Sequence, residues 1–438
     1  MSTIPQVAQA LRVVLNSTAD AAACHTNFMQ RRSKLTGSRF VQSLVFGWLK
    51  NPQASLEELT QITAALGVSV SPQGLDQRFS PEAAATLEQV LNAAVTQVIA
   101  SQPVAIPLLQ RFSSVVVLDS STVVLPDALA HIWSGNGSRT GQGTAALKFQ
   151  VSLDLCTGTL SGPLLQDGRC HDRTSPLQDA ALPAGSLRLA DLGYFSLDVL
   201  RNMARQGVFF LSRLQVQTLV FAQDGKGLDL PKVLRAQTSE PIDLEVCIGN
   251  KHQLPVRLLA APVEPKVAQE RRRKLKLDAR RRCQPVSKMR LALADWTILV
   301  TNAPPELLTL KEALVLARAR WQIELLFKLW KQHGQIDEWR TQKPWRILCE
   351  VYAKLLAMLI QHWLLLVSCW VYPDRSLVKG AQTVRSYVVM LVSAMAGIVE
   401  MTAVLETLRR TLSSGCRMNP RRRKPNAYQL LLDPNRGP

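Results

Sequence analysis

The sequence predicts an α/β protein, and three observations lead to that prediction. Short apolar, β-branched runs alternate with a helical stretch between residues 113 and 211. A segment rich in Ala, Leu and Gln precedes this region, and helix-forming sequence resumes at residue 309. Between residues 213 and 304 the rhythm breaks into strand-like runs around a basic segment. Alternating strands and helices are typical of an α/β core, so the segment 213–304 is predicted to be an insertion.

The charge is unevenly distributed along the 438 residues. The chain has 52 Lys and Arg against 33 Asp and Glu, a net charge of +19. Residues 1–100 and 101–212 carry +1 and 0, whereas residues 213–305 and 306–438 carry +8 and +10. Apolar residues make up 47% of the chain, which excludes general disorder. The basic second half indicates a polyanionic partner, either nucleic acid or an anionic membrane surface.

The sequence favours a reducing cytoplasm without a membrane partner. The N-terminus lacks the basic and apolar regions of a signal peptide. The longest apolar stretch, 355–372, is interrupted by Gln361 and His362, so we expect a buried core helix rather than a membrane span. The eight cysteines are scattered without a CxxC pair, which indicates neither a zinc ribbon nor a disulfide framework.

Residues 1–100 are predicted to be helical. Ser55 and Glu58 form a capping box, and Ser71 and Ser80, each followed by Pro, begin two further helices. Three short helices with tight turns resemble a helix-turn-helix module, which would bind DNA. An ordinary helical bundle fits the same pattern at least as well.

Two apolar strands of the predicted core are followed by an aspartate. Residues 113–119 form a continuous run that ends in Asp119, and the shorter run 187–190 precedes Asp191. Active groups gather at the carboxyl ends of strands in open α/β sheets, although an aspartate there is also a routine cap. The other predicted elements of this core are strands at 147–155 and 208–211 and a helix at 196–206.

The insertion contains three predicted strands and a basic tract. The strands are predicted at 244–248, 256–260 and 296–301. The tract begins with Arg271, Arg272, Arg273 and Lys274 and continues to Arg282. The tract has two interpretations. It is a helix or loop that contacts DNA, or it is a solvated segment that aids solubility.

A helix without Gly or Pro is predicted at 317–331. Arg320, Glu324, Lys328 and Lys331 are spaced 4, 4 and 3 apart, so they would share one helical stripe. A solvated face with i,i+4 ion pairs would show this spacing. A single carboxylate among three cations fits a metal ligand beside bound phosphates better.

Three carboxylates from two strands and a helix are a plausible metal-binding set. Asp119, Asp191 and Glu324 supply hard oxygen ligands, which suit two Mg²⁺ or Mn²⁺ ions. Two such ions can activate the attacking oxygen and stabilise the leaving oxygen in phosphodiester displacement.

These blocks resemble the DDE transposases of bacterial insertion sequences, of the insertion-sequence-four type. The family's signature on the third-acid helix is Tyr-x2-Arg-x3-Glu-x6-Lys. Arg320, Glu324 and Lys331 match it, whereas Ala317 stands at the Tyr position. Residues 115–122 and 189–195 are similar to the family's first and second aspartate blocks, and the match extends roughly from residue 110 to 335.

The resemblance implies an RNase H-like catalytic core interrupted by the strand-rich insertion, with helical N- and C-terminal regions. The implied segments are a DNA-end-binding domain (1–100), the first part of the core (101–212), the basic insertion (213–304), the second part of the core (305–372) and a C-terminal region with a basic tail (373–438). The helices at 388–408 would form a dimer interface, or their apolar stripe would be internal core.

The resemblance also implies a function. Two metal ions on the three acids would support cleavage at the terminal inverted repeats, through a hairpin intermediate, and strand transfer into target DNA by a homodimer. Arg320, Lys328, Lys331, Trp321 and the Arg271–Lys274 tract would contact DNA. Trp296 resembles the tryptophan that stacks on a base flipped out of the hairpin, although a strand aromatic in the core fits equally.

Two alternatives remain open from the sequence. Ala317 favours a non-catalytic, transposase-derived DNA-binding protein or an inactivated copy. An RNase H-like nuclease such as a resolvase shares the acids but does not account for the basic insertion.

Overall fold

The computed structural model describes residues 3–31, 33–137, 143–236, 240–251, 253–421 and 425–436. The chain forms two compact units from segments far apart in sequence. The first contains Met1–Ile106, Asp119–Cys170 and Gln322–Lys424, and the second contains Pro107–Leu118, His171–Trp321 and Pro425–Pro438. These units cut across the five segments expected from the sequence.

Within these described ranges, nine strands pair in the order β3-β2-β1-β4-β5-β9-β8-β7-β6. Their bounds are β1 (Val115–Leu125), β2 (Ala145–Asp154), β3 (Leu160–Asp167), β4 (Leu187–Ala190), β5 (Phe209–Arg213), β6 (Val220–Phe221), β7 (Ile242–Ile248), β8 (Leu254–Pro262) and β9 (Trp296–Thr301). The pairs β1–β4 and β4–β5 are parallel. The pairs β2–β3, β5–β9, β8–β9, β7–β8 and β6–β7 are antiparallel. The prediction of an α/β protein is therefore confirmed.

The predicted core and insertion strands are found close to their expected positions, but β3 and the two-residue β6 are additional strands that the pattern does not predict. The pair Gly162-Pro163 indicates a turn, whereas the structure places both residues inside β3. Because β3 is the last strand in the pairing order, a proline there breaks no ladder on its outer side.

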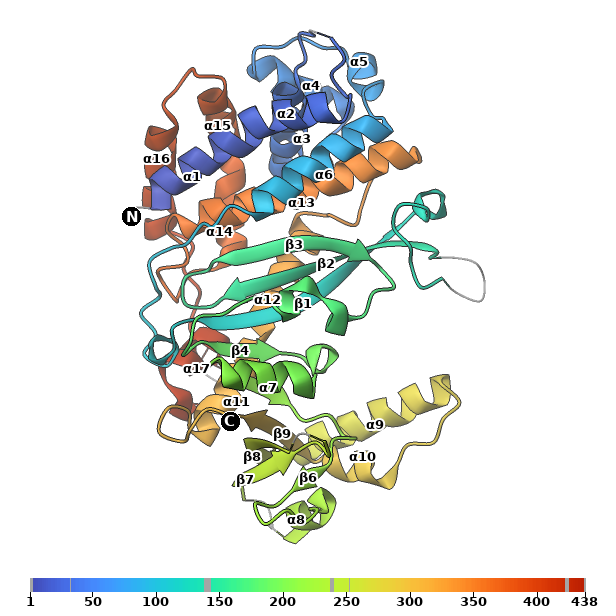
Figure 1. The fold of residues 1–438 in the computed structure, drawn as a ribbon. Coiled ribbons are helices and arrows are strands. Elements are labelled where there is room, and N and C mark those ends of the chain that lie inside the picture. Colours follow the sequence, from blue (N-terminus) through green and yellow to red (C-terminus); the bar gives the residue numbers. More distant parts are fainter. Residues whose placement is uncertain are drawn as a thin grey trace. The chain divides into compact units, whose positions relative to one another are not determined.

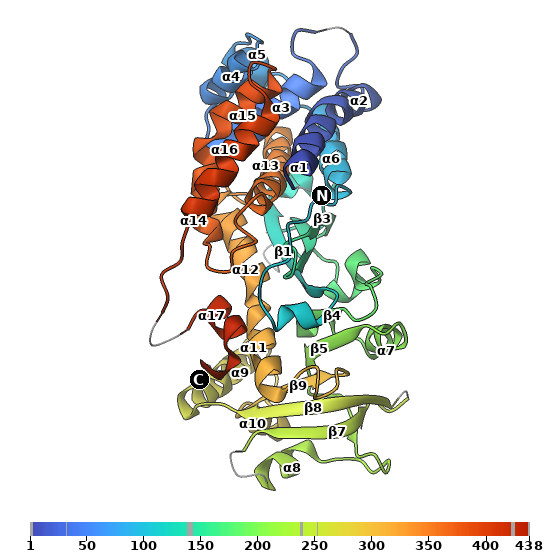
Figure 2. The same ribbon diagram turned by 90° about the vertical axis from the view of Figure 1, so that its left-hand side faces the viewer.

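The second unit contains the insertion and a core of its own. Helices α7 (Leu197–Arg205), α8 (Leu230–Ala236), α9 (Pro265–Arg281) and α10 (Lys288–Leu293) accompany the strands. Figure 2 shows β7 and β8 side by side with α8 next to them. Leu200, Phe210, Val246, Leu258 and Val300 belong to one buried cluster, so strands on both sides of β9 share this core. The helical alternative for the basic tract is confirmed by α9.

The first unit contains most of the helices. They are α1 (Thr3–Arg12), α2 (Ala19–His25), α3 (Gly37–Lys50), α4 (Leu56–Ala65), α5 (Pro72–Asp76), α6 (Pro81–Val95), α13 (Pro344–Leu366), α14 (Leu377–Ser386), α15 (Val388–Met395) and α16 (Met401–Ser414). The capping box at Ser55 and the caps at Ser71 and Ser80 are present as predicted. The remaining helices are α11 (Leu310–Ala319), α12 (Trp321–Lys328) and α17 (Ala427–Leu432).

Helix α13 is the centre of the first unit's helical layer (Figure 1). Both α3 and α6 pack against it, and every residue from Ile347 to Leu366 is buried. α13 is long and apolar enough to cross a membrane, but its most apolar 18-residue window lies wholly inside the protein. The predicted buried core helix is therefore confirmed, although it begins and ends earlier than expected. The N-terminal helices accordingly have the packing of a helical bundle.

Most apolar side chains of the C-terminal helices α15 and α16 are buried inside the first unit. Val388, Leu391, Leu405 and Leu408 are fully buried. Beside them, Val389, Met390, Ile398 and Val399 are exposed. Of the expected basic tail, Arg422–Lys424 lies outside the described residues.

Candidate active site and DNA-contacting surface

Asp119 lies within β1, not at its end. The predicted strand stops at Asp119, but the observed one continues through Ser120, Ser121 and Thr122 to Leu125. The polar run gives no strand signal because these side chains are only half-buried, while the buried pattern resumes at Val123. The backbone N–H of Ser120 donates to Asp119 Oδ1 at 2.8 Å, which helps to orient the carboxylate.

Asp191 directly follows β4, as predicted, and begins the short turn Leu192–Tyr194. The parallel register of β1 and β4 ends with the pair Leu118↔Ala190. Asp119 and Asp191 are therefore each the next residue after that last pair. Successive side chains alternate between the two faces of a strand, so Asp119 and Asp191 hold the same place in this alternation.

A buried cation lies in the strand that leads to Asp191. Arg188 is 6% exposed, and its Nη1 donates to the backbone oxygen of Gln178 at 3.1 Å. Its other terminal nitrogen donates to the Gln178 side chain. Burial lowers the pKa of Arg188 to about 10, partly offset by Tyr194 and Asp179. Arg188 thus fixes the loop around Gln178 onto β4.

Glu324 lies on a helix that is shorter than predicted. α11 ends at Ala319, α12 begins at Trp321, and residues Leu329–His333 form a π-helical turn. The N–H of Gly334 bonds to the carbonyl of Leu329, five residues back. The predicted single α-helix at 317–331 is therefore interrupted at Arg320, and it ends in a π turn that contains Lys331. The shared stripe of the four charged residues stays a prediction.

The Glu324 helix is fixed to the sheet by aromatic packing. The rings of Phe327 and Trp330 lie 5.5 and 5.8 Å from the ring of Phe149 in β2. Leu326 and Leu329 are buried, as predicted, but Leu325 is 42% exposed. The large aromatic side chains therefore contribute contacts that the leucine pattern does not predict.

Lys331 bonds to the strand that carries Asp119. Its Nζ donates to the carbonyl oxygen of Thr122 at 2.7 Å and lies 3.8 Å from Asp337. Lys328, by contrast, is exposed, and no hydrogen bond or ion pair involves its side chain among the described residues. Lys331 thus supports the site, while Lys328 is available to a ligand.

The three acids come from both compact units. Asp119 and Glu324 belong to the first and Asp191 to the second. Within the described ranges, no group of three or more His, Cys, Asp or Glu side chains is placed to hold a metal ion. Carboxylates are the donors that Mg²⁺ and Mn²⁺ prefer, so the donor set fits the predicted ions in chemistry.

Trp296 borders a hollow of about 690 Å³ in the second unit. Leu192, the residue after Asp191, lines the same hollow, and so do Arg213, Arg271 and Arg290. Trp296 is half-buried and packs against the unit's core. Trp296 therefore has the core contacts of the first predicted role, and its stacking on an extruded base stays a prediction. Arg213 and Arg290 are not among the predicted residues because single cations beside strands carry no distinctive sequence signal.

The basic tract does not contribute four equivalent cations. Arg271 donates to the carbonyl of Trp296 at 3.0 Å and to Thr297 Oγ1 at 3.1 Å, and burial and Arg213 lower its pKa. Arg272 pairs with Asp295, and Lys274 lies 3.3 Å from Glu270. Arg273 is exposed, and the structure records no polar partner for it among the described residues.

The side chains of the remaining predicted DNA contacts lie around the start of α12. Trp321 is 55% exposed, and Arg320 is half-buried at the junction between α11 and α12. Ala317, at the position of the family tyrosine, is half-buried in α11.

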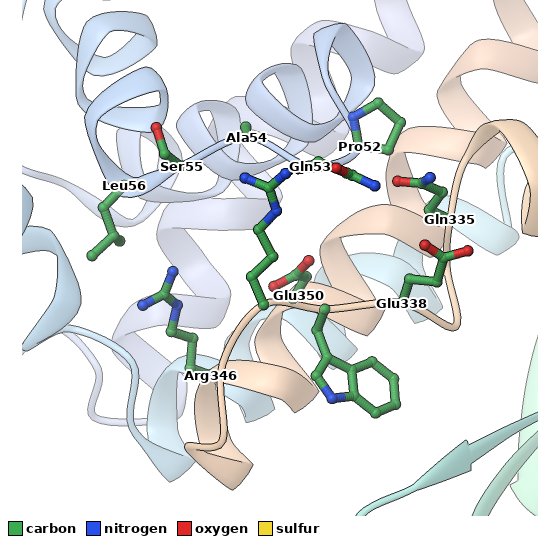
Figure 3. A pocket seen from close by; sticks show the side chains of 11 residues that line it. Pro52, Gln53, Ala54, Ser55, Leu56, Gln335, Glu338, Arg346 and Glu350 are labelled. Carbon is green, nitrogen blue, oxygen red and sulfur yellow. Dashed lines mark hydrogen bonds between the residues drawn. The ribbon is translucent and has the colours of Figure 1, made fainter.

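A second hollow, of about 250 Å³, lies in the first unit. Figure 3 shows Gln335, Glu338 and Glu350 on one side and the loop 52–56 on the other. Arg340 donates to Gln53 Oε1 at 2.6 Å across it. This hollow contains none of the acids or cations predicted from the sequence.

Comparison with known families assigns the chain. A family model described as the transposase DDE domain matches residues 110–360, which is more than half of the chain. That span contains both aspartate blocks, the insertion and the Glu324 helix. The chain belongs to the DDE transposase family, as the sequence blocks indicated.

Relatives of known name are transposases of bacterial insertion sequences. The transposase for insertion sequence element IS231F of Bacillus thuringiensis subsp. israelensis is 26% identical over 98% of this chain and 94% of its own length. That for IS231C of B. thuringiensis subsp. berliner is 28% identical over 78% of this chain and 76% of its length. That for IS1151 of Clostridium perfringens is 23% identical over the same shares.

Proposed function

We propose that this chain is a DNA transposase that cuts phosphodiester bonds at the terminal inverted repeats of an insertion sequence and joins the freed ends to target DNA. The observation that carries the proposal is the register of β1 and β4. Asp119 and Asp191 each follow the last pair, Leu118↔Ala190, so the two carboxylates stand at matching positions just beyond the paired register of two parallel strands.

An RNase H-like core is part of the proposal. The order β3-β2-β1-β4-β5, antiparallel at β2–β3 and parallel from β1 to β5, supports it. The insertion between β5 and α11 leaves and rejoins the sheet through β9. This topology accounts for the 133 positions that separate Asp191 from Glu324.

Asp119, Asp191 and Glu324 are the proposed ligands of two Mg²⁺ or Mn²⁺ ions. When bound, such ions activate the attacking oxygen and stabilise the leaving oxygen. The chain's own residues hold the acids: Ser120 bonds to Asp119, and Lys331 bonds to Thr122. Phe149 fixes the helix of Glu324. Rigid support of this kind keeps ligands in productive geometry.

The side chains proposed to contact DNA differ in their exposure to solvent. Lys328 and Trp321 are exposed on α12, and Arg320 lies at its start. These three would hold DNA phosphates and bases near the acids, since Lys and Arg neutralise phosphates and aromatic rings stack on bases. Lys331 would act by holding β1 rather than by meeting the scissile phosphate directly.

Release through a hairpin is supported by the hollow beside Trp296. An extruded base needs an aromatic surface and an apolar pocket, and the hollow offers Trp296, Leu192 and the cations Arg213 and Arg290. The active assembly is proposed to be a homodimer on two DNA ends, supported by the exposed apolar residues between α15 and α16.

A non-catalytic, transposase-derived DNA-binding protein is the second candidate. Ala317 favours it, because the tyrosine of the family signature is absent. The two candidates predict different behaviour of the purified protein on DNA that carries the inverted repeats.

Strand cleavage of labelled inverted-repeat DNA in the presence of Mn²⁺ tests the proposal. Wild type should nick at the element's end, while Glu324→Gln and Asp191→Asn should lose cleavage by roughly 10³-fold, a typical order for removal of a key electrostatic group, and retain end binding. Glu306→Gln, which changes an exposed carboxylate elsewhere, is the matched control. Binding without cleavage by wild type would favour the second candidate, and wild-type cleavage by the Glu324 variant would refute the assigned acids.

A further inference from the structure

Helix α9 has two faces of different chemistry. Only Ala268 of its 17 residues is buried. Arg271, Leu275 and Ala279 are half-buried on the same side, at spacings of 3, 4 and 4 that place them on one helical face. Leu275 and Arg271 line the hollow beside Trp296. This inner face attaches α9 to the second unit.

The opposite face is a row of four cations. Lys266, Arg273, Lys276 and Arg280 are all exposed, and their spacings of 7, 3 and 4 keep them on one side of the helix. No hydrogen bond or ion pair to their side chains is recorded within the parts of the chain that the structure describes. At 1.5 Å per residue the row is about 21 Å long.

The acids of α9 do not neutralise this row. Eight of the 17 residues are Lys or Arg and two are acidic. Glu270 is paired with Lys274, at 3.3 Å, and Asp278 lines the hollow on the inner side. Arg272 is paired with Asp295 of the neighbouring segment. The structure thus separates cations that hold α9 in place from cations that face outward.

Like charges at i,i+3 and i,i+4 repel one another along a helix. Lys276 stands in that relation to both Arg273 and Arg280, so the outer row is unfavourable in the free protein. A polyanion that lies along the helix removes the repulsion. Duplex DNA carries about one negative charge per 1.7 Å of its axis, so a row of about 21 Å passes several phosphates.

We infer that the outer row of α9, formed by Lys266, Arg273, Lys276 and Arg280, binds the backbone of double-stranded DNA without regard to sequence. This inference rests on the proposed function and deepens it. Phosphate contacts position DNA but carry no sequence information, and Gln269 is the one neutral hydrogen-bonding side chain on this face. The row therefore adds affinity for any duplex, including target DNA, and does not select the element's ends.

The salt dependence of duplex binding tests this inference. The full-length variant Arg273→Ala/Lys276→Ala/Arg280→Ala is compared with wild type by fluorescence anisotropy. Removal of one phosphate-binding cation should flatten the slope of log affinity against log salt by about 0.9, so the triple variant should be flatter by about 2.7. The affinity should fall equally for inverted-repeat DNA and for a random duplex of the same length. Alanine favours helix, so α9 should remain folded, which circular dichroism checks.

A control variant removes the same charge elsewhere. Lys226, Lys232 and Arg409 are each paired with a nearby acid, and their joint replacement by Ala should leave the slope near the wild-type value. Equal slopes for the two triple variants would overturn the inference. A weakening confined to inverted-repeat DNA would show sequence reading, and binding of α9 to phosphatidylserine vesicles instead of duplex would show a membrane surface; either result would overturn it. Duplex affinity is measured without added metal, whereas the assigned acids are tested by cleavage with Glu324→Gln, so the inference and the proposed function fail in different measurements.

Discussion

Lys331 Nζ lies 2.7 Å from the carbonyl oxygen of Thr122, although 209 positions separate the two residues. Thr122 stands three residues after Asp119 on β1, and Lys331 stands seven residues after Glu324. This single bond therefore ties the strand of one proposed acid to the helix of another. It gives Lys331 of the family signature a structural role, which we propose in place of direct contact with the scissile phosphate.

Lys331→Met should impair cleavage more than DNA binding. Removal of a charged hydrogen bond that is about one-third exposed should lower the free energy of unfolding by about 1 kcal/mol. Because β1 and the π-helical turn would no longer be joined, kcat for cleavage should fall while the affinity for end DNA changes little. Chemical denaturation and single-turnover cleavage measure the two effects.

Lys328→Met is the matched control for Lys331. Lys328 lies on the same helix and is exposed, so its replacement should leave stability unchanged and weaken DNA binding, with a flatter salt dependence. If both variants lost binding equally and stability not at all, Lys331 would be a phosphate contact and not a support for β1.

The fold could be predicted where local chemistry determines it. The caps at Ser55, Ser71 and Ser80 are visible in the sequence because a side-chain oxygen must satisfy the first amides of each helix. β3 is not visible because Gly162 and Pro163 signal a turn except at the edge of a sheet. Which strand lies at the edge depends on long-range pairing, and a sequence does not show that directly.

Lys354→Met should strongly destabilise the first unit. Lys354 is buried in α13, and its Nζ donates to Glu350 at 2.7 Å and to the carbonyls of Gln335 and Glu338 at 3.0 and 2.7 Å. Burial lowers the pKa of Lys354 and raises that of Glu350. Removing the cation leaves a buried carboxylate without its partner, which costs about 3–5 kcal/mol.

The double variant Lys354→Met/Glu350→Gln separates charge from packing. It should recover a substantial part of the stability that the single variant lacks, because no uncompensated charge remains. Urea denaturation of the wild type, the single and the double variant gives the comparison. A single variant with the stability of wild type would contradict the prediction.

His362 should make the first unit sensitive to mild acid. Its ring is buried, and Nε2–H donates to the carbonyl of Gly158 at 2.7 Å. Burial lowers the pKa of His362 from 6.5 to about 4. Because the unfolded chain takes up the proton that the folded protein resists, the free energy of unfolding should fall as pH drops from 6.5 toward 4 and then level off. The total contribution is about 3 kcal/mol.

His362→Gln removes this titration and keeps a donor for Gly158. Its stability should depend less on pH between 6.5 and 4 than that of wild type, as followed by denaturation at several pH values. Gly158 itself should not be replaced in this test, since it has φ +71 and an added Cβ would lie 2.5 Å from Leu366. Parallel pH profiles for the two proteins would contradict a neutral, buried His362.

The proposed acids could be named from the sequence, but their support could not. Asp119, Asp191 and Glu324 stand in blocks that resemble a known family. The π-helical turn after Lys328 has no signal of its own, and the sequence does not show that its Trp330 stacks on Phe149. The sequence also does not show which cations of the basic tract face inward. Arg271 and Arg273 are equivalent in the sequence, but in the structure Arg271 bonds to Trp296.

Trp296→Ala should decide between the two roles proposed for this side chain. If Trp296 stacks on an extruded base, the first nick should proceed at the wild-type rate while hairpin formation slows about 10- to 100-fold, since stacking contributes about 1–3 kcal/mol per base. If Trp296 serves only the core, unfolding stability should fall and both steps should slow together. Trp296→Phe preserves an aromatic face and should retain most of the hairpin step. A pre-nicked end substrate isolates the hairpin step. Among the described residues, Trp296 is the one aromatic residue that lines the hollow, so no other lining residue could replace its stacking. Equal hairpin rates for Trp296→Ala and wild type would therefore exclude the stacking role.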